Sequence, residues 1–575
     1  MSEYLKEFNR WLDNKSLDAS LREELLKMKD DEKEIKQWFS CPLSFGTAGL
    51  RGVMTAGLNA MNIYTVRQAT QGLSDYINEQ KKAERGVVIA YDSRNNSELF
   101  AKISAEVLAA NGIKVYIFES LRPTPVLSFA LRELRCIAGI NITASHNPSK
   151  YNGYKAYWED GAQLGPEQAA AVSNYISKTD IFDGVKYVDF DEAVNSGKIT
   201  VIGREIDEKY LKCVKEQAVS PELFEKVADS LKIVYTPLHG TGRTLVPEIL
   251  KMCGLKQLYT VDCQMEPNGN FPGTPNPNPE FPEVFEEGIK IAEDVKSDLI
   301  IATDPDADRV GIMARAKDGS FKCLTGNQVG SLLLDYIITA YEEKGIVPDS
   351  PYAVKTIVST ELATKICNEH GVKIHNVLTG FKFIGEVIKN YEQKGYGSFI
   401  LGFEESYGYL KGTYARDKDA VVASMLLCEM AAYNMQKGMT LYDALLGLYE
   451  KYGYYFEGVQ NVYMEGLDGK ERMDNLMESL RNDPPKEIGG KKVVSVRDYK
   501  TGVIRNTETG ETESTGLPSS NVLYFVNESG DVVVVRPSGT EPKLKLYFLV
   551  NGKTAEEADK ALDGCRSTMK ELCGI

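Results

Sequence analysis

Apolar strand patterns alternate with amphipathic helix patterns along most of this chain, and the alternation restarts three times. The first unit spans residues 41–205, the second 206–322 and the third 323–455. Such alternation is typical of sheets whose strands are joined by helices packed on the sheet faces. At 575 residues the chain is also too long for one hydrophobic core. We therefore predict three similar mixed α/β domains.

The two ends of the chain depart from this alternation. Over residues 1–40, apolar residues recur at helical spacing among charged ones, which predicts a helical extension packed on the first domain. Residues 456–575 instead carry paired strand patterns at 522–526, 531–535 and 544–550, followed by a closing helix. This composition indicates a smaller fourth domain of α+β type.

Each predicted domain contains one polar loop directly after an apolar strand. These loops span residues 143–148, 304–309, 402–408 and 536–540. Open α/β sheets usually bind ligands beyond the carboxyl ends of their strands. We therefore expect these loops to carry the chemistry of the protein.

The loop of the first domain, Thr143-Ala-Ser-His-Asn-Pro148, follows a strand predicted at 137–142. We expect Ser145 to lie on an exposed loop with its hydroxyl free to react. Its neighbour His146 is expected to point away, because adjacent side chains on an extended segment face opposite sides. Ser145 lacks the G-x-S-x-G elbow of the α/β-hydrolases. Taken alone, the stretch is better interpreted as an ordinary Ser-Asn-Pro turn, and it is the other three loops that favour a reactive serine.

In the second domain, Asp304, Asp306 and Asp308 occupy alternate positions after a buried strand. Closely spaced carboxylates are typical ligands of Mg²⁺ or Ca²⁺. An EF-hand loop is excluded, because the positions that need Gly and Glu hold Arg309 and Arg315. A solvated acidic turn remains as the alternative, although three uncompensated carboxylates there would repel one another.

The remaining two loops suit a phosphorylated sugar. Arg536-Pro-Ser-Gly-Thr540 combines a guanidinium with hydroxyls and backbone N–H groups, which are the groups that grip a phosphate. A plain β-turn is the alternative. Glu404 and Ser406, at the end of a strand, could bind vicinal sugar hydroxyls, or they could form a helix-capping pair.

Several other classes of protein are excluded by composition and missing motifs. Gly240-Thr-Gly242 follows a strand, but Leu245 replaces the third glycine of a dinucleotide fingerprint, and the P-loop motif is missing. A net charge of −15 argues against a nucleic-acid or membrane-surface role. Ten cysteines without C-x-x-C spacing indicate reduced thiols, and no apolar run is long enough for a signal core or a membrane span. We expect a cytoplasmic protein.

With its four loops in this order, the chain resembles the α-D-phosphohexomutase superfamily over nearly its whole length. The motifs that carry the resemblance are Thr143–Pro148, Asp304–Arg309, Gly402–Ser406 and Arg536–Pro542. The length, the helical extension and the loop Phe45-Gly-Thr-Ala-Gly-Leu-Arg-Gly52 look most like the long phosphoglucomutase branch. The resemblance implies four domains around a central cleft, the last similar to the TATA-binding-protein-like α+β fold.

The resemblance also implies roles for individual residues. Ser145 would carry a phosphoryl group, and Asp304, Asp306 and Asp308 would hold Mg²⁺ together with an oxygen of the Ser145 phosphate. The transfer site would be lined by Arg51, His146, Lys155 and Lys418. The sugar and its phosphate would be bound by Arg309, Thr379, Gly380, Glu404, Ser406, Arg536, Ser538, Gly539 and Thr540.

The implied reaction is the interconversion of α-D-glucose 1-phosphate and glucose 6-phosphate through a phosphoserine enzyme, with glucose 1,6-bisphosphate as intermediate and activator. The partners would be small sugar phosphates, with neither nucleic acid nor membrane, and the chain would act as a monomer or homodimer. Phosphomannomutase-type members carry a histidine where this chain has Gly408, whereas Lys418 matches a lysine of the glucomutase branch. This favours glucose over mannose. Phosphopentomutase and phosphomannomutase activities remain alternatives, as does a catalytically silent sugar-phosphate sensor.

Overall fold

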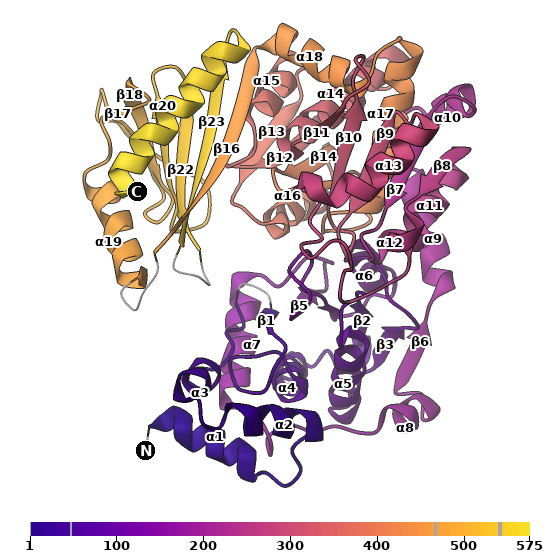
Figure 1. The fold of residues 1–575 in the computed structure, drawn as a ribbon, viewed down its shortest axis with the longest axis vertical. Helices are drawn as coiled ribbons and strands as arrows, with labels where there is room; N and C mark the ends of the chain where they lie inside the picture. The colour runs from indigo at the N-terminus through magenta and orange to yellow at the C-terminus, as the bar shows by residue number, and fades with distance from the viewer. Residues whose placement is uncertain (1, 47–48, 465–468, 539–542, 575) are drawn as a thin grey trace.

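The computed structural model describes residues 2–46, 49–464, 469–538 and 543–574, and these residues form four sheets flanked by helices. The first domain lies at one end of the molecule, with the other three arranged above it in the view of Figure 1. The predicted fold class is confirmed: three α/β domains precede an α+β domain.

The first domain has a six-stranded sheet in the order β1-β5-β4-β2-β3-β6. Strands β2, β3, β4 and β6 run parallel, and β5 pairs antiparallel with both β1 and β4. The elements are β1 (Gly49–Val53), α4 (Ile63–Glu79), β2 (Val87–Tyr91), α5 (Ser97–Ala110), β3 (Val115–Phe118), α6 (Thr124–Glu133), β4 (Ala138–Ile142), β5 (Tyr151–Trp158), α7 (Pro166–Lys178), α8 (Phe190–Asn195) and β6 (Ile199–Ile202).

A three-helix extension precedes this sheet: α1 (Glu3–Asp13), α2 (Ala19–Met28) and α3 (Glu32–Phe39). Trp11, which is fully buried, contacts Phe39 edge-on and also packs against Tyr64 and Phe182. These aromatic contacts attach the extension to the first domain.

The second domain carries a five-stranded sheet in the order β11-β10-β9-β7-β8. Its strand β9 is buried along its whole length and leads directly into the acidic loop. The elements are α9 (Arg204–Lys215), α10 (Glu222–Val227), β7 (Lys232–Thr236), α11 (Gly242–Met252), β8 (Gln257–Thr260), α12 (Asp262–Met265), α13 (Glu286–Val295), β9 (Leu299–Thr303), β10 (Val310–Arg315) and β11 (Phe321–Leu324).

The third domain has a four-stranded sheet in the order β13-β12-β14-β15. One apolar cluster runs from the first domain through the second into the third, and each of these domains also has a cluster of its own. The elements are α14 (Gly326–Lys344), β12 (Pro351–Thr356), α15 (Glu361–Glu369), β13 (Lys373–Val377), α16 (Phe381–Lys394), β14 (Ser398–Glu404), β15 (Gly408–Leu410), α17 (Ala420–Gln436) and α18 (Leu441–Tyr452).

The fourth domain is an antiparallel sheet in the order β16-β23-β22-β21-β18-β19-β20, with β17 paired to β18 and two helices, α19 and α20. It has a core of its own and contacts the third domain through a separate apolar cluster. The elements are β16 (Tyr454–Tyr463), α19 (Gly469–Asn482), β17 (Glu487–Ile488), β18 (Lys491–Asp498), β19 (Val503–Asn506), β20 (Thr512–Ser514), β21 (Leu523–Asn527), β22 (Val532–Pro537), β23 (Lys543–Gly552) and α20 (Ala555–Cys573).

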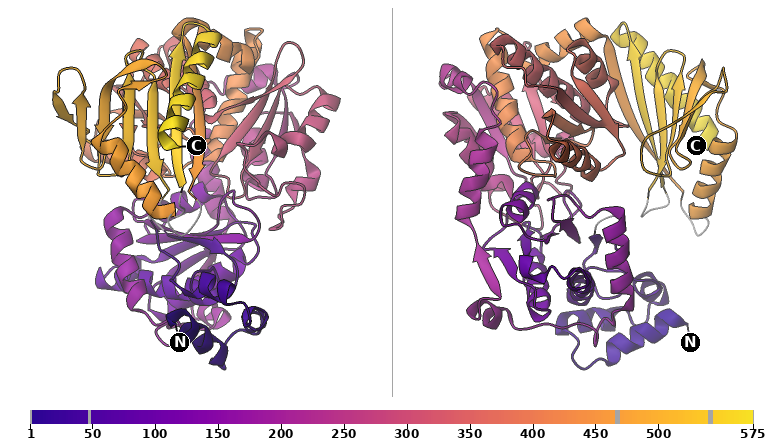
Figure 2. Two further views of the ribbon diagram at one scale, coloured as in Figure 1. Left: turned by 60° about the vertical axis from the view of Figure 1, so that its left-hand side comes forward. Right: turned by 180° about the vertical axis from the view of Figure 1, so that it is seen from behind.

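Figure 2 shows the same arrangement from two further sides, with the fourth domain beside the third and above the first. All ten cysteines are free. Within the described ranges, no helix combines the length and apolar character needed to cross a membrane.

Candidate active site

Ser145 lies at the junction of the first two domains. Its hydroxyl donates a hydrogen bond to Asp304 Oδ2 at 2.7 Å, although 159 positions separate the two residues in the chain. The side chain is 7% exposed. The expectation of an exposed loop was therefore wrong, because the second domain covers the end of β4 and brings Asp304 against the hydroxyl.

His146 does not point away from Ser145, in contrast to the sequence-based expectation. Its Nδ1 lies 3.2 Å from Ser145 Oγ. The reason is local: Ser145 has a φ of 51°, so the segment is left-handed rather than extended and adjacent side chains can approach. Burial, with a contribution from Arg309, lowers the pKa of His146 well below its usual range, so the imidazole is neutral at physiological pH.

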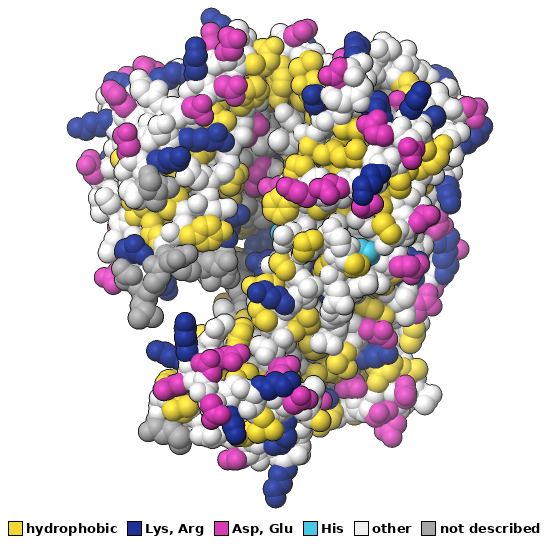
Figure 3. Space-filling view, in the orientation of Figure 1, with side chains coloured by type: hydrophobic (Ala, Val, Ile, Leu, Met, Phe, Trp, Pro, Cys, Tyr) yellow, Lys and Arg dark blue, Asp and Glu magenta, His cyan; other side chains and the backbone are white. Residues whose placement is uncertain are grey.

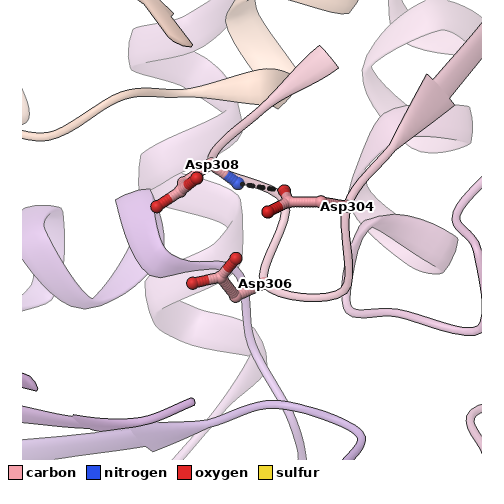
Figure 4. Close-up of side chains that lie close together, drawn as sticks. All are labelled: Asp304, Asp306 and Asp308. Carbon is pink, nitrogen blue, oxygen red and sulfur yellow. Dashed lines mark hydrogen bonds between the residues drawn. The ribbon is translucent and has the colours of Figure 1, made fainter. Parts of the chain in front are cut away.

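Asp304, Asp306 and Asp308 form a buried cluster whose ligand atoms lie within 4.8 Å of one another. Figure 4 shows the three carboxylates grouped around one turn, with the backbone N–H of Asp308 donating to Asp304 Oδ1 at 3.1 Å. One carboxylate oxygen of Asp306 and one of Asp308 are buried without a hydrogen bond among the described residues. Buried, unbonded oxygens of this kind fit a hard divalent cation, so the residues present suit Mg²⁺.

Cations from two other domains balance part of this negative charge. Lys155, on β5, places Nζ 2.8 Å from Asp306 Oδ2 and 3.4 Å from Asp308 Oδ2. Lys418, in the third domain, lies 3.3 Å from Asp308 Oδ2. Burial disfavours the charged form of each lysine, but the carboxylates outweigh it and raise both pKa values. The acidic turn is therefore neither solvated nor uncompensated.

The carboxylates of the cluster differ in protonation behaviour. Burial and the adjacent carboxylates raise the pKa of Asp304 well above its usual range. Burial also opposes ionisation of Asp306, but the Lys155 ammonium outweighs it and lowers the pKa of Asp306. A divalent cation would favour the ionised form of all three groups.

Lys418 also connects the acidic cluster with the loop 402–408. Its ammonium lies 2.9 Å from Asp417 Oδ1, and Asp417 accepts further hydrogen bonds from Tyr157 and Gln163 of the first domain. Gly408 faces the stem of this lysine: a Cβ at Gly408 would lie 2.1 Å from Lys418 Cδ. The position therefore tolerates no side chain while Lys418 keeps its path.

Glu404 lies at the end of β14 and is 5% exposed. Its Oε1 accepts a hydrogen bond from the backbone N–H of Gly380 at 2.8 Å, so the substrate-binding candidates Thr379, Gly380 and Glu404 are close together. Burial raises the pKa of Glu404 to about 7, against the opposing effect of Lys418. Ser406 is partly buried on the same turn.

Arg536 ends a strand of the fourth domain in a basic environment. It is paired across the sheet with Lys545. Burial and the charges of Arg536 and Lys543 lower the pKa of Lys545. Such a cluster of cations favours an anionic ligand. Ser538 donates its backbone N–H to Lys543 at 2.8 Å, whereas Gly539 and Thr540 lie outside the described residues.

The two remaining arginine candidates lie at the edges of the acidic centre. Arg51 is exposed and donates to Asn147 Oδ1 at 3.3 Å, next to the Ser145 loop. Arg309 is partly buried, with Nε 3.7 Å from Asp308 Oδ1. Figure 3 shows a hollow that opens between the fourth domain and the first, with Lys and Arg side chains at its inner end.

Sequence reasoning missed several residues of this site. Thr124, at the start of α6, donates its hydroxyl to Asp306 Oδ2 at 2.9 Å and its N–H to the Asp306 carbonyl at 2.9 Å. Arg94 and Asp417 were missed as well. The location of Thr124 and Arg94 in the sequence could have indicated their role. They follow β3 and β2, at the same carboxyl edge of the sheet as Ser145.

A serine and a carboxylate cluster where the first three domains meet, with a fourth domain carrying a basic loop, define the class of protein: an α-D-phosphohexomutase. Models of the phosphoglucomutase/phosphomannomutase α/β/α domains I, II and III match residues 42–181, 208–318 and 325–452, and the model of the C-terminal domain matches 472–563. A phosphoglucomutase of Staphylococcus saprophyticus is 37% identical over 547 residues, covering 95% of this chain and 97% of that protein. The chain belongs to the phosphoglucomutase/phosphomannomutase family.

Other relatives agree with this assignment. A phosphoglucomutase of Staphylococcus aureus is 37% identical over 89% of this chain and 90% of its own. Among solved structures, parafusin, a phosphoglucomutase from Paramecium, in its open form has a TM-score of 0.69 at 17% identity, covering 93% of this chain and 96% of that one. A putative phosphomannomutase from Thermus thermophilus has a TM-score of 0.66 at 21% identity, covering 92% and 99%. At these identities the two structures show the shared fold.

Proposed function

We propose that this chain is a phosphoglucomutase that interconverts α-D-glucose 1-phosphate and glucose 6-phosphate. Ser145 carries the phosphoryl group between turnovers, and glucose 1,6-bisphosphate is the intermediate. The observation that supports this most directly is the 2.7 Å contact of Ser145 Oγ with Asp304, inside the buried three-carboxylate cluster. The similarity to named phosphoglucomutases over nearly the whole chain supports the choice of sugar.

Asp304, Asp306 and Asp308 would hold Mg²⁺, together with an oxygen of the Ser145 phosphate. When bound, the cation supplies positive charge next to the transferring phosphoryl group. The orphaned oxygens of Asp306 and Asp308 support this ligand set.

In the forward half-reaction, the bond between phosphorus and Ser145 Oγ breaks, and phosphorus bonds to the free hydroxyl oxygen of glucose 1-phosphate. Lys155 and Lys418 hold positive charge next to the acidic cluster and stabilise charge that develops during transfer. The proton that the sugar hydroxyl loses ends on Ser145 Oγ, which becomes a hydroxyl again. The neutral ring of His146 has Nδ1 3.2 Å from that oxygen and can accept a hydrogen bond from it.

In the second half-reaction, the bisphosphate turns over within the site, and its other phosphate returns to Ser145. Arg536, Ser538, Gly539 and Thr540 grip the phosphate that is not being transferred, whichever end of the sugar carries it. Arg309, Thr379, Gly380, Glu404 and Ser406 bind the sugar, and Arg51 lies at the entrance to the transfer site. Exclusion of water protects the phosphoserine from hydrolysis.

The contact between Gly408 and Lys418 supports glucose as the sugar. Phosphomannomutase-type members, by resemblance, carry a histidine at the Gly408 position. Here even a Cβ would collide with the lysine stem at 2.1 Å. The glucomutase-type lysine and a side chain at position 408 therefore exclude each other in this chain.

A coupled assay of the purified, bisphosphate-primed protein tests the proposal. It compares glucose, mannose, glucosamine and ribose 1-phosphates under one set of conditions. We expect the highest kcat/KM for glucose 1-phosphate. A preference for ribose or mannose phosphates would replace the proposed activity with a phosphopentomutase or phosphomannomutase. Failure to turn over any of the four would favour a silent sugar-phosphate sensor.

A further inference from the structure

Ser145 is held in an unusual backbone conformation. Its φ of 51° places a residue with a Cβ in the left-handed region, which side chains disfavour. The N-terminal side of the residue is fixed by the Thr143 hydroxyl, which accepts the Ser145 N–H at 2.8 Å. Such a conformation persists only where the surroundings determine it, so the carbonyl side of the loop must be held as well.

Arg94, from the segment after β2, holds that side. Its Nη2 donates to the carbonyl oxygens of Ser145 and Asn147. Its Nη1 donates to the carbonyl oxygens of Pro148 and Tyr151, at 3.1 Å each. One guanidinium therefore binds four carbonyls of the segment that carries Ser145. A lysine ammonium lacks the planar fork needed to reach all four in this geometry.

The guanidinium is itself fixed by its surroundings. Its Nε lies 3.2 Å from Asp92 Oδ2, and both side chains are fully buried. Asp92 is anchored in turn by the Ser97 hydroxyl at 2.7 Å and the Arg94 N–H at 2.9 Å. Phe271, from the Pro- and Asn-rich loop of the second domain, lies with its ring centroid 5.0 Å from the guanidinium carbon. Asp92 neutralises the charge of Arg94, so the ion pair affects the loop mainly by fixing its backbone conformation.

The two sides of the loop therefore have separate functions. The carbonyls of Ser145 and Asn147 are turned toward Arg94, and the Ser145 hydroxyl is turned toward Asp304 and His146. A change in the carbonyl contacts would rotate the peptide that sets the direction of the hydroxyl. Displacement of a reacting atom by about 1 Å can cost about a hundredfold in rate.

We propose that Arg94 is a positioning residue for phosphoryl transfer: it fixes the left-handed backbone at Ser145 and thereby aims the Ser145 oxygen at the transferring phosphorus. This rests on the proposed function. Arg94 itself touches neither the serine hydroxyl nor the acidic cluster among the contacts described.

The matched control is Arg315, at the end of β10. Its guanidinium also binds backbone carbonyls, those of Ser297, Gly319 and Ala292 at 2.6, 2.8 and 2.9 Å. It also lies over an aromatic ring, that of Phe321, at 4.3 Å. Arg315 lies at the opposite end of β9 from the acidic loop, because its N–H bonds to the carbonyl of Asp298, where β9 begins. Arg315→Lys thus removes a similar clamp far from the site.

The experiment compares wild type, Arg94→Lys and Arg315→Lys, each primed with glucose 1,6-bisphosphate and assayed below its own melting temperature. We expect both variants to lose thermal stability. Only Arg94→Lys should lose kcat, by about a hundredfold, with KM for glucose 1-phosphate within about twofold of wild type. The rate of phosphoryl transfer to Ser145 from labelled bisphosphate in a single turnover should fall by the same factor.

A kcat for Arg94→Lys within threefold of that of Arg315→Lys would overturn the proposal and leave Arg94 a stabilising residue. A rise in KM for Arg94→Lys without a change in kcat would overturn the proposal as well. If Arg94→Lys does not fold, Asp92→Asn, which loosens the guanidinium without removing it, takes its place with the same criteria and an expected loss of about tenfold in kcat. An inactive wild type would instead refute the proposed function, so the two failures are distinguishable.

Discussion

Two domains supply the surroundings of Ser145. The first domain fixes its backbone, through Thr143 and Arg94, and the second provides the carboxylate that meets its hydroxyl. Its reactivity therefore depends on the docking of the loop after β4 against the loop after β9 as much as on the serine itself. This is the arrangement that in-line transfer requires, since catalysis of that reaction rests on positioning and electrostatics.

The first prediction at the residue scale concerns the serine. Ser145→Ala should lower kcat at least about a thousandfold, because no other hydroxyl replaces the carrier. Stability should change by no more than about 1 kcal/mol, the net value of one hydrogen bond. Coupled kinetics and thermal melts test this, with Ser104→Ala, a buried helical serine, as control. Activity within tenfold of wild type would contradict the role of Ser145 as phosphoryl carrier.

The second prediction concerns the acidic cluster. EDTA should abolish turnover and added Mg²⁺ should restore it, with EDTA already saturated with Mg²⁺ as the control. Asp306→Asn should lower the rate and weaken the apparent affinity for Mg²⁺ together, because it removes one unit of ligand charge. Titration of activity against Mg²⁺ measures both quantities. Full activity in excess chelator would show that the cluster is not a required metal site.

The third prediction follows from Glu404, whose pKa burial raises from 4.5 to about 7. Because the folded chain holds this proton more tightly than the unfolded chain, the contribution of Glu404 to stability is greatest below pH 4.5. It should fall as pH rises to about 7 and then level off, by about 3 kcal/mol in total. Glu404→Gln removes this titration. The difference in unfolding free energy between wild type and variant, measured by urea from pH 4.5 to 8, should change in that window. A difference independent of pH would contradict the prediction.

At the element scale, the strand and helix patterns were sufficient to predict most of the fold. Periodicity placed the strands predicted at 137–142 and 522–526 within one residue at each end, since β4 is Ala138–Ile142 and β21 is Leu523–Asn527. The same local patterns failed at Ser145 and His146. Whether a loop is buried depends on which domain docks against it. A left-handed φ at a serine cannot be predicted from the residue types around it. Contacts such as those of Thr124 and Asp417 depend likewise on tertiary structure.

The fourth prediction belongs to the short strand β15 and the loop before α17. Gly408→Ala should destabilise the protein by about 1–3 kcal/mol, because its Cβ would overlap the stem of Lys418 at 2.1 Å. In a Lys418→Ala background, the same substitution should cost at least about 1 kcal/mol less, since the obstructing stem is gone. Urea unfolding of wild type, the two single variants and the double variant measures this difference in unfolding free energy.

Gly447→Ala is the matched control for this cycle. It lies in helix α18, where an added Cβ meets nothing within 4 Å. It should be neutral or stabilising by up to about 1 kcal/mol. If the losses of unfolding free energy from Gly408→Ala and Lys418→Ala simply add in the double variant, a side chain at position 408 and Lys418 do not exclude each other.

At the scale of the whole molecule, charge is distributed unevenly. The chain carries a net charge of −15, yet Arg536, Lys543 and Lys545 gather at one edge of the fourth domain. The fourth domain has its own core, whereas one apolar cluster joins the first three domains. A phosphate socket on a separately packed domain can grip either end of a sugar bisphosphate and close over it. Because the fourth domain has its own core, it can move relative to the other three domains without disrupting the cluster that joins them.

The last prediction tests this socket. Arg536 can present two parallel N–H donors to a dianionic phosphate. The phosphate that it holds is not transferred, so its grip acts equally on the ground and transition states, and such interactions mainly set KM. Arg536→Ala should therefore raise KM for glucose 1-phosphate by about 10- to 100-fold, the equivalent of about 1.5–3 kcal/mol for a charged hydrogen bond. A smaller fall in kcat should follow from incomplete closure of the fourth domain. Arg505→Ala, at an exposed position on β19 of the same domain, should leave both constants unchanged. Steady-state kinetics that show an unchanged KM for Arg536→Ala would place the bound phosphate elsewhere and leave Arg536 as a structural residue of its turn.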